Sequence, residues 1–121
     1  MNSSRRSKTS NTHKGRLGED ISCKHLQSRG FVVQERNHKT REGEIDVIAS
    51  NDSLILFVEV KRRTSKTFGL PIESLPKRRI ERLFNASLLY LEQNPQFQKL
   101  ERGYLLHAIY GEKLTEIEIT S

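Results

Sequence analysis

Apolar side chains near the start of the chain recur at the spacing of an amphipathic helix. Leu17 and Ile21 fall on one face of residues 14–29, with Leu26 beside that face. Gly30 follows in the position where glycine commonly ends a helix. We therefore expect a first helix over residues 14–29.

A second helical pattern lies in the latter half of the chain. Ser74 can cap it, and Pro76 suits its first turn, where a missing N–H does no harm. Apolar side chains then recur at helical spacing as far as Leu91. Asn94-Pro95 ends the pattern, because proline disfavours helical geometry in the residue before it. This is the clearest helix that the sequence predicts.

Short runs of β-branched and aromatic residues predict five strands. They are expected at residues 31–34, 43–49, 54–61, 104–110 and 114–119. The polar residues 37–42 are expected to form a loop, and Asn51-Asp52 a tight turn between the second and third strands. The order helix, three strands, helix, two strands predicts an α/β sandwich with a mixed β-sheet.

The chain of 121 residues has room for one domain with a modest core. Residues 1–14 are basic and rich in Ser, Asn and Thr, so we expect a flexible N-terminal tail followed by a single domain over residues 15–121. No segment has the apolar length of a signal peptide or membrane span, and Cys23 is the only cysteine. A cytoplasmic protein without a membrane partner is the expectation.

Positive charge favours a polyanionic partner. The chain has 21 Lys+Arg against 15 Asp+Glu, a formal net charge of +6. Basic clusters occur around residues 36–41, 61–66 and 77–82, so they flank an acidic centre at residues 42–59. Taken singly, each cluster is also explained as a solvated face of the protein.

The acidic centre has a pattern suited to a site. Because side chains alternate along a strand, Asp46 shares a face with Glu44 and Ile48, and Glu59 shares one with Lys61. If the two strands pair around the turn at residues 51–53, Asp46 and Glu59 lie almost opposite each other. Two carboxylates so close repel each other and require compensation.

A divalent cation would provide that compensation. Mg²⁺ takes oxygen ligands, usually one or two carboxylates together with water and substrate phosphate. Lys61, on the face of Glu59, would stabilise developing negative charge. The simpler interpretation is a solvated face with ordinary ion pairs, but Ile55 and Phe57 on the same face favour partial burial.

These residues resemble the signature of the PD-(D/E)XK nuclease superfamily, with Ile45 in place of its proline. A longer set of motifs, in the same order, resembles the YraN-like family of endonucleases related to archaeal Holliday junction resolvases. The motifs are Gly15-Arg16-Leu17-Gly18-Glu19-Asp20, Gly30-Phe31, Arg36-Asn37, Gly43-Glu44-Ile45-Asp46, Phe57-Val58-Glu59-Val60-Lys61-Arg62-Arg63 and Gly69-Leu70-Pro71.

The resemblance implies a restriction-endonuclease-like sandwich, a central mixed β-sheet flanked by helices. It implies that Asp46, Glu59 and the Val60 carbonyl hold Mg²⁺ or Mn²⁺, with Glu19 contributing directly or through water, and that Lys61 is catalytic. By analogy it also implies a homodimer acting on branched or recombination DNA. Without the resemblance, Glu19 is a typical surface residue near a helix N-terminus.

Other residues have weaker claims. Arg62, Arg63, Lys77 and Arg41 are candidates for contact with the nucleic-acid backbone. Glu44 is either a rim glutamate paired with a nearby arginine or an additional ligand. The histidines His25 and His107 are expected to be packing or surface residues, because they form no metal-spaced pair.

Three functions are therefore consistent with the sequence. The first is a Mg²⁺- or Mn²⁺-dependent endonuclease that hydrolyses phosphodiester bonds, with DNA as the expected substrate. The second is a non-catalytic nucleic-acid-binding module that retains the nuclease fold. The third is a structural or adaptor protein. The trio Asp46, Glu59 and Lys61 favours the first, since converging carboxylates would only repel phosphate in a metal-free binding module.

Overall fold

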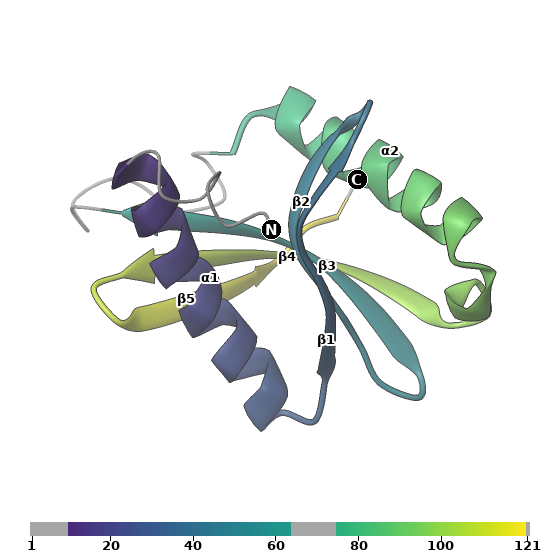
Figure 1. Cartoon of the computed structure of the whole chain (residues 1–121), viewed down its shortest axis with the longest axis horizontal. Helices are drawn as coiled ribbons and strands as arrows, with labels where there is room; N and C mark the ends of the chain where they lie inside the picture. The colour runs from purple at the N-terminus through teal and green to yellow at the C-terminus, as the bar shows by residue number, and fades with distance from the viewer. Residues whose placement is uncertain (1–9, 64–74, 121) are drawn as a thin grey trace, which may run out of the picture.

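The computed structural model describes residues 10–63 and 75–120 of the chain. Two helices, a 3₁₀ turn and five strands follow one another (Figure 1). In chain order they are α1 (Ser10–Ser28), β1 (Val32–Thr40), β2 (Gly43–Ser50), β3 (Leu54–Arg63), α2 (Lys77–Gln93), η3 (Pro95–Phe97), β4 (Glu101–Tyr110) and β5 (Lys113–Glu118).

The strands form one mixed sheet in the order β1-β2-β3-β4-β5. β1, β2 and β3 pair antiparallel, β3 and β4 pair parallel, and β5 returns antiparallel to β4. α2 lies in the connection between the two parallel strands, as such a crossover requires. The predicted α/β sandwich with a mixed sheet and the element order α-β-β-β-α-β-β are confirmed, and the architecture is restriction-endonuclease-like.

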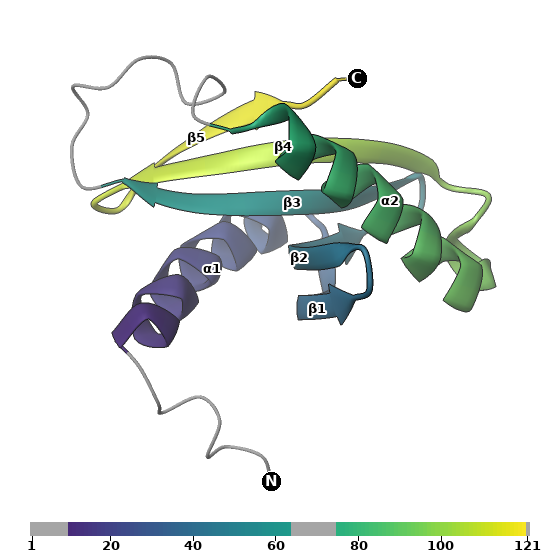
Figure 2. The same ribbon diagram turned by 90° about the horizontal axis from the view of Figure 1, so that it is seen from above.

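The two faces of the sheet carry separate apolar clusters. Successive residues of β3 alternate between them: Ile55 and Phe57 pack with α2, whereas Leu56 and Val58 pack with α1. In Figure 2, α1 lies on the lower side of β3 and β4, and the first turns of α2 lie on the upper side. Within the described residues, neither helix is long and apolar enough to cross a membrane.

The strand predicted at residues 31–34 is much longer in the structure. β1 continues through the polar residues 35–40, of which 37–40 were expected to belong to a loop, and these pair with residues 43–48 of β2. β1 is an edge strand with mostly exposed side chains, so polar residues are solvated there at no cost. Thr40 closes the turn, because its Oγ1 accepts hydrogen bonds from the N–H groups of Glu42 and Gly43.

Both helices differ from the prediction at their starts. α1 begins at Ser10 rather than at residue 14, and the rest of the predicted tail lies outside the described residues. Ser74, the expected cap of the second helix, also lies outside them. Pro76 occupies the N-cap of α2 with extended geometry, one residue before the first turn. The predicted end of the helix at Asn94 is confirmed.

Candidate active site

Asp46 of β2 lies beside β3, at the point where the regular pairing of the two strands ends. The last paired residues are Val47 and Val58, so Asp46 and Glu59 are the next residues on the two strands. Asp46 Oδ2 accepts a hydrogen bond of 2.8 Å from the Val60 N–H. The carboxylate thus takes the place of a main-chain acceptor and is fixed beside Glu59.

The strict alternation expected across this part of β2 is wrong. Ile45 packs with Ile48 in the cluster under α2, although the two residues are three positions apart. Figure 1 shows the physical reason, because the β1–β2 hairpin twists steeply away from β3 and rises between the two helices. Gly43 begins this segment with φ +146°, a conformation that residues with a side chain rarely adopt, whereas an added Cβ would meet the Arg82 Cβ of α2 at an ordinary contact distance of 3.4 Å. The backbone conformation, rather than the space beside α2, therefore favours glycine there.

The Asp46 carboxyl is held in an environment that disfavours its charge. Burial and the neighbouring charge of Glu59 raise the pKa of Asp46 from 3.8 to about 8. The hydrogen bond from Val60 lowers the pKa but does not offset these effects. Glu19 and Glu44 add further negative charge nearby. The site therefore concentrates carboxylates without enough positive charge to balance them.

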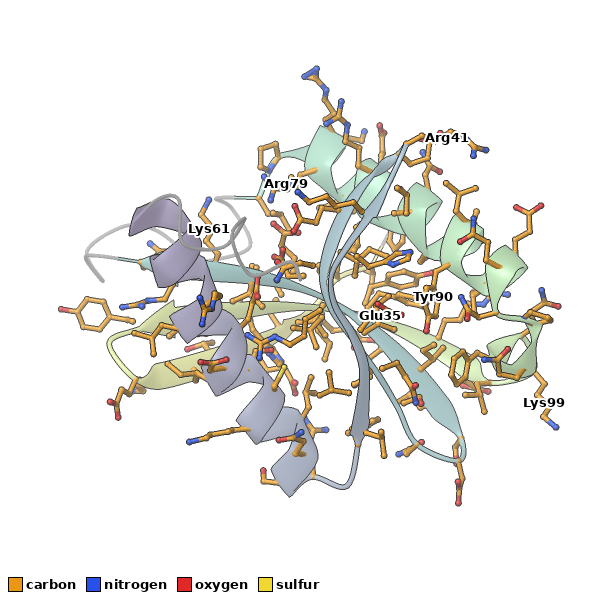
Figure 3. The ribbon with its side chains drawn as sticks, viewed as in Figure 1. Glu35, Arg41, Lys61, Arg79, Tyr90 and Lys99 are labelled. Atoms are coloured by element: carbon orange, nitrogen blue, oxygen red, sulfur yellow. The ribbon has the colours of Figure 1, made fainter. Side chains whose placement is uncertain are left out.

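Glu59 is buried, with 4% of its surface exposed, and pairs with a residue of α2. The Arg79 Nη2 lies 2.6 Å from its Oε2. Burial raises the pKa of Glu59, and the charges of Arg79 and Lys61 offset only part of that effect. Figure 3 shows Lys61 and Arg79 in the region between α1 and the start of α2. Two positively charged side chains, Lys61 of β3 and Arg79 of α2, thus stabilise the charge of the Glu59 carboxylate.

Glu19 reaches the same region from α1. It is buried, with 6% exposed, and its Oε1 accepts a hydrogen bond of 2.8 Å from the Asn37 side-chain amide. Arg36 lies 3.5 Å from the same oxygen and forms a shorter ion pair of 2.7 Å with Asp20. Burial raises the pKa of Glu19, against the opposing effects of Asn37 and Arg36.

Asn37 has an unusual backbone that supports this contact. Its φ is +54°, and among the described residues it is the one non-glycine with positive φ. Asparagine tolerates this left-handed conformation better than most residues, but a strained residue persists only where its surroundings hold it. The strain at Asn37 is therefore associated with its hydrogen bond to Glu19.

A cavity of about 210 Å³ opens beside these groups. Gly43, Glu44, Glu59, Arg79, Arg82 and Leu83 line it. Glu44 is exposed on its rim, and its charge acts on Glu19, Asp46 and Glu59 alike. The cavity is thus open to solvent and carries both carboxylates and guanidinium groups.

The predicted backbone-binding residues are distributed around the site. Arg41 is exposed at the tip of the β1–β2 hairpin, and Lys77 is exposed at the start of α2. Arg62 is exposed, with its aliphatic stem 3.0 Å from the position of a Cβ on Gly18 of α1, and Arg63 ends β3 half-buried. Arg79, Arg36 and Asn37 were not predicted as site residues. For Arg36 and Asn37, the only indication in the sequence was that both belong to a motif of the family resemblance.

A different group brings three potential ligand residues together more tightly. Among the described residues, the one set of three His, Cys, Asp or Glu side chains with ligand atoms all within 4.8 Å is His25, His107 and Glu116. Glu19, Asp46 and Glu59 do not meet so closely. His25 and His107 were expected to be packing or surface residues that form no metal-spaced pair, but the structure brings them together, with ring centroids 5.4 Å apart.

Comparison with known proteins places the chain in a family. Residues 18–110 match the group described as "Uncharacterised protein family UPF0102". The chain belongs to the UPF0102 family. The resemblance to the YraN-like family is thereby confirmed, since UPF0102 is that family.

Individual UPF0102 proteins resemble the chain over most of its length. A UPF0102 protein of Syntrophomonas wolfei is 41% identical over 87 residues, covering 72% of this chain and 76% of that protein. A UPF0102 protein of Sulfurihydrogenibium is 35% identical over 107 residues, covering 88% and 92% respectively. The second similarity thus extends across most of both chains.

Proposed function

We propose that this protein is a Mg²⁺- or Mn²⁺-dependent endonuclease that hydrolyses the DNA backbone. The observation that carries the proposal is the half-buried Asp46 carboxyl, which is hydrogen-bonded to the Val60 N–H and whose pKa is raised to about 8 by desolvation and the charge of Glu59. Such an arrangement destabilises the fold unless a cation neutralises it. Strongly perturbed carboxyls beside an open cavity are typical of a functional site.

The donor set fits a hard divalent cation. The carboxylates of Asp46 and Glu59 and the Val60 carbonyl would hold Mg²⁺ or Mn²⁺, with Glu19 as a direct or water-mediated ligand. When bound, such an ion polarises a phosphodiester and lowers the pKa of a coordinated water. Carboxylate and carbonyl oxygens are the ligands that these ions prefer, and no thiolate or imidazole is required.

The remaining residues have separate tasks in this proposal. Lys61 stabilises negative charge that develops on the phosphoryl oxygens. Arg79 balances the charge of Glu59 and, with a metal ion on that carboxylate, would be able to contact a phosphate oxygen instead. Asn37 and Arg36 hold the Glu19 carboxylate in a fixed orientation. Each role follows from the group that the side chain faces.

Binding to DNA relies on the basic residues around the cavity. Arg41, Arg62, Arg63 and Lys77 contact the phosphate backbone, which attracts the chain by its net charge of +6. We extend the proposal, by analogy with resolvase-like nucleases, to branched or recombination intermediates as substrates. By the same analogy the protein acts in the cytoplasm as a homodimer, which would cut paired strands.

Cleavage assays test the proposal directly. Linear, nicked, flapped and four-way DNA are incubated with the full chain and Mg²⁺ or Mn²⁺. We expect cleavage that Asp46→Ala, Glu59→Ala and Lys61→Ala abolish while DNA binding survives. Matched controls are Glu92→Ala and Lys99→Ala, exposed residues on α2 and beyond it, which should cleave normally. Absence of cleavage on every substrate, with binding retained, would instead support a non-catalytic binding module.

A further inference from the structure

His25, His107 and Glu116 meet on the α1 face of the sheet, each from a different element. His25 belongs to α1, His107 to β4 and Glu116 to β5. The Nε2 atoms of His107 and His25 lie 2.8 and 3.7 Å from the Oε2 of Glu116. The rings of the two histidines meet edge to face at 5.4 Å. Three potential ligand atoms therefore face one point.

We propose that His25, His107 and Glu116 form a transition-metal site of the zinc class, separate from the carboxylate site beside β2. Two imidazoles and one carboxylate are a donor set that suits Zn²⁺, whereas Mg²⁺ prefers oxygen ligands. With zinc–ligand bonds of about 2.0–2.1 Å, tetrahedral geometry separates ligand atoms by roughly 3.3 Å. The two separations from Glu116, 2.8 and 3.7 Å, bracket that value, and all three ligand atoms lie within 4.8 Å of one another, so side-chain rotation would close them around the ion.

The base of the site has the partner that a metal-bound histidine requires. His107 is fully buried, and its Nδ1 lies 2.7 Å from the Ser22 Oγ of α1. With Nε2 bound to metal, the Nδ1–H donates to this hydroxyl, which fixes the tautomer and the ring orientation. Burial also lowers the pKa of His107, which keeps its imidazole neutral as a ligand must be.

The mouth of the site is accessible. The side chains of His25 and Glu116 are 34% and 25% exposed, so an ion can enter from solvent and water can complete its coordination. A metal held there would join α1 to the β4–β5 hairpin. Since α1 also carries Glu19, this ion would brace the helix that contributes to the carboxylate site.

Arg29 opposes the metal and provides a test of the site. Its Nη1 lies 2.7 Å from the Glu116 Oε1 and 3.5 Å from the His25 Nε2. The other oxygen of Glu116, Oε2, faces the two histidines, and a metal ion would replace its hydrogen bond with the His107 Nε2. The Arg29 side chain is 47% exposed, so its guanidinium can turn toward solvent. Its positive charge weakens binding of a cation, and Arg29→Gln should therefore strengthen it.

Zinc titration of the untagged full chain tests the proposal. The protein is freed of metal with a chelator and titrated calorimetrically with Zn²⁺, and Co²⁺ is used as a spectroscopic probe of ligand type. An Asp46→Asn background removes competition from the carboxylate site. We expect one equivalent of zinc to bind, the Tm to rise, and Co²⁺ to give visible absorption of a four-coordinate site.

The variants assign the binding to this group of residues. His25→Gln and Glu116→Gln are partly exposed substitutions that keep the fold, and each should weaken zinc binding at least tenfold. His38→Gln is the matched control and should bind as the parent does, whereas Arg29→Gln should bind more tightly. Undetectable zinc binding, or equal affinity in His25→Gln and Glu116→Gln, would overturn the proposal. The group would then be a hydrogen-bonded network alone.

Discussion

At the scale of the residue, the environment that makes Asp46 a candidate site residue also lowers the stability of the folded protein. Its pKa is raised from 3.8 to about 8, so at neutral pH the folded protein holds a proton that the unfolded chain releases. The folded state therefore loses stability as pH rises through this window. Asparagine keeps an oxygen for the Val60 N–H and has no proton to lose. We expect Asp46→Asn to raise the free energy of unfolding at pH 7.5, without divalent metal, by roughly 2–4 kcal/mol.

Urea denaturation in a chelator at several pH values measures this effect. The gain of Asp46→Asn should shrink as pH falls toward about 4, where the unfolded parent also binds the proton. Asp52→Asn, an exposed residue of the β2–β3 turn, is the control and should change stability little. A loss of stability in Asp46→Asn at pH 7.5 would contradict the assigned environment of the carboxyl.

Arg79 leads to a second expectation about single residues. Its guanidinium occupies the Glu59 oxygen that a metal would use, so it competes with metal binding. Arg79→Gln should lower the Mg²⁺ concentration that gives half of the metal-induced rise in Tm, by about threefold or more, on the order of 0.7 kcal/mol. The neighbouring exposed Arg78→Gln should leave that concentration unchanged. If Arg79→Gln instead raised this Mg²⁺ concentration, the guanidinium would favour metal binding rather than compete with it.

The site could be predicted from sequence only as far as its residues are neighbours in the sheet. The hairpin turn is a local property, and the pairing that it sets makes Asp46 and Glu59 the next residues beyond the last pair, although strict alternation fails at this part of β2. Glu19 is on a helix packed on the sheet, and only its family motif indicated a role. The contact of Arg79 with Glu59 depends on how α2 docks, which no local pattern encodes. The same holds for His25 and His107, which are 5.4 Å apart through the docking of α1.

At the scale of the element, the parallel pairing of β3 and β4 depends on a close contact. Gly103 of β4 is paired with Leu56 of β3, and a Cβ on Gly103 would lie 2.7 Å from the Leu56 Cδ2. Leu56 is buried in the α1-side cluster, so its side chain has little room to move. Gly103→Ala should lower the free energy of unfolding by about 1–3 kcal/mol through overpacking.

A double-mutant cycle in thermal or urea unfolding isolates this contact. Leu56→Val removes the atom that clashes, so Gly103→Ala should cost less in the Leu56→Val protein than in the parent, by about 1 kcal/mol. Gly111→Ala is no suitable control, because Gly111 has φ +62°, a backbone conformation in which an alanine would be strained even without a close contact. Additive effects of the two substitutions would show that Leu56 does not set the requirement for glycine.

Prediction of the elements succeeded where side chains are buried on a regular pattern. The centre of α2 and the strands β2 and β3 have such patterns because they contribute to the apolar clusters. It failed for β1, where residues 35–40 are polar and exposed and form a strand only because β2 supplies their main-chain partners. An edge strand of this kind has no hydrophobic signature, since pairing rather than burial determines it.

At the scale of the whole molecule, opposite charges are separated into a centre and a rim. The carboxylates of Glu19 and Glu59 are buried, whereas Arg41, Arg62 and Lys77 are exposed on separate elements around them. A polyanion is attracted to the rim, and its phosphates can enter the centre only where the carboxylates are neutralised. Under the proposed function, the rim would give DNA binding its salt dependence whether or not metal is present, and phosphates would enter the centre only when metal neutralises the carboxylates.

Salt dependence of binding measures the contribution of each rim residue. In the Asp46→Asn protein, which should bind DNA without cutting it, the affinity should fall steeply as salt rises. Arg62→Gln and Lys77→Gln should each reduce the slope of log affinity against log salt concentration by about 0.9, because each removes one phosphate contact. Lys99 lies at the opposite end of the molecule from Lys61 and Arg79 (Figure 3), so Lys99→Gln should leave the slope unchanged. If Lys99→Gln reduced the slope as much as Arg62→Gln, the attraction would come from net charge alone, and the rim would not be the DNA-binding surface.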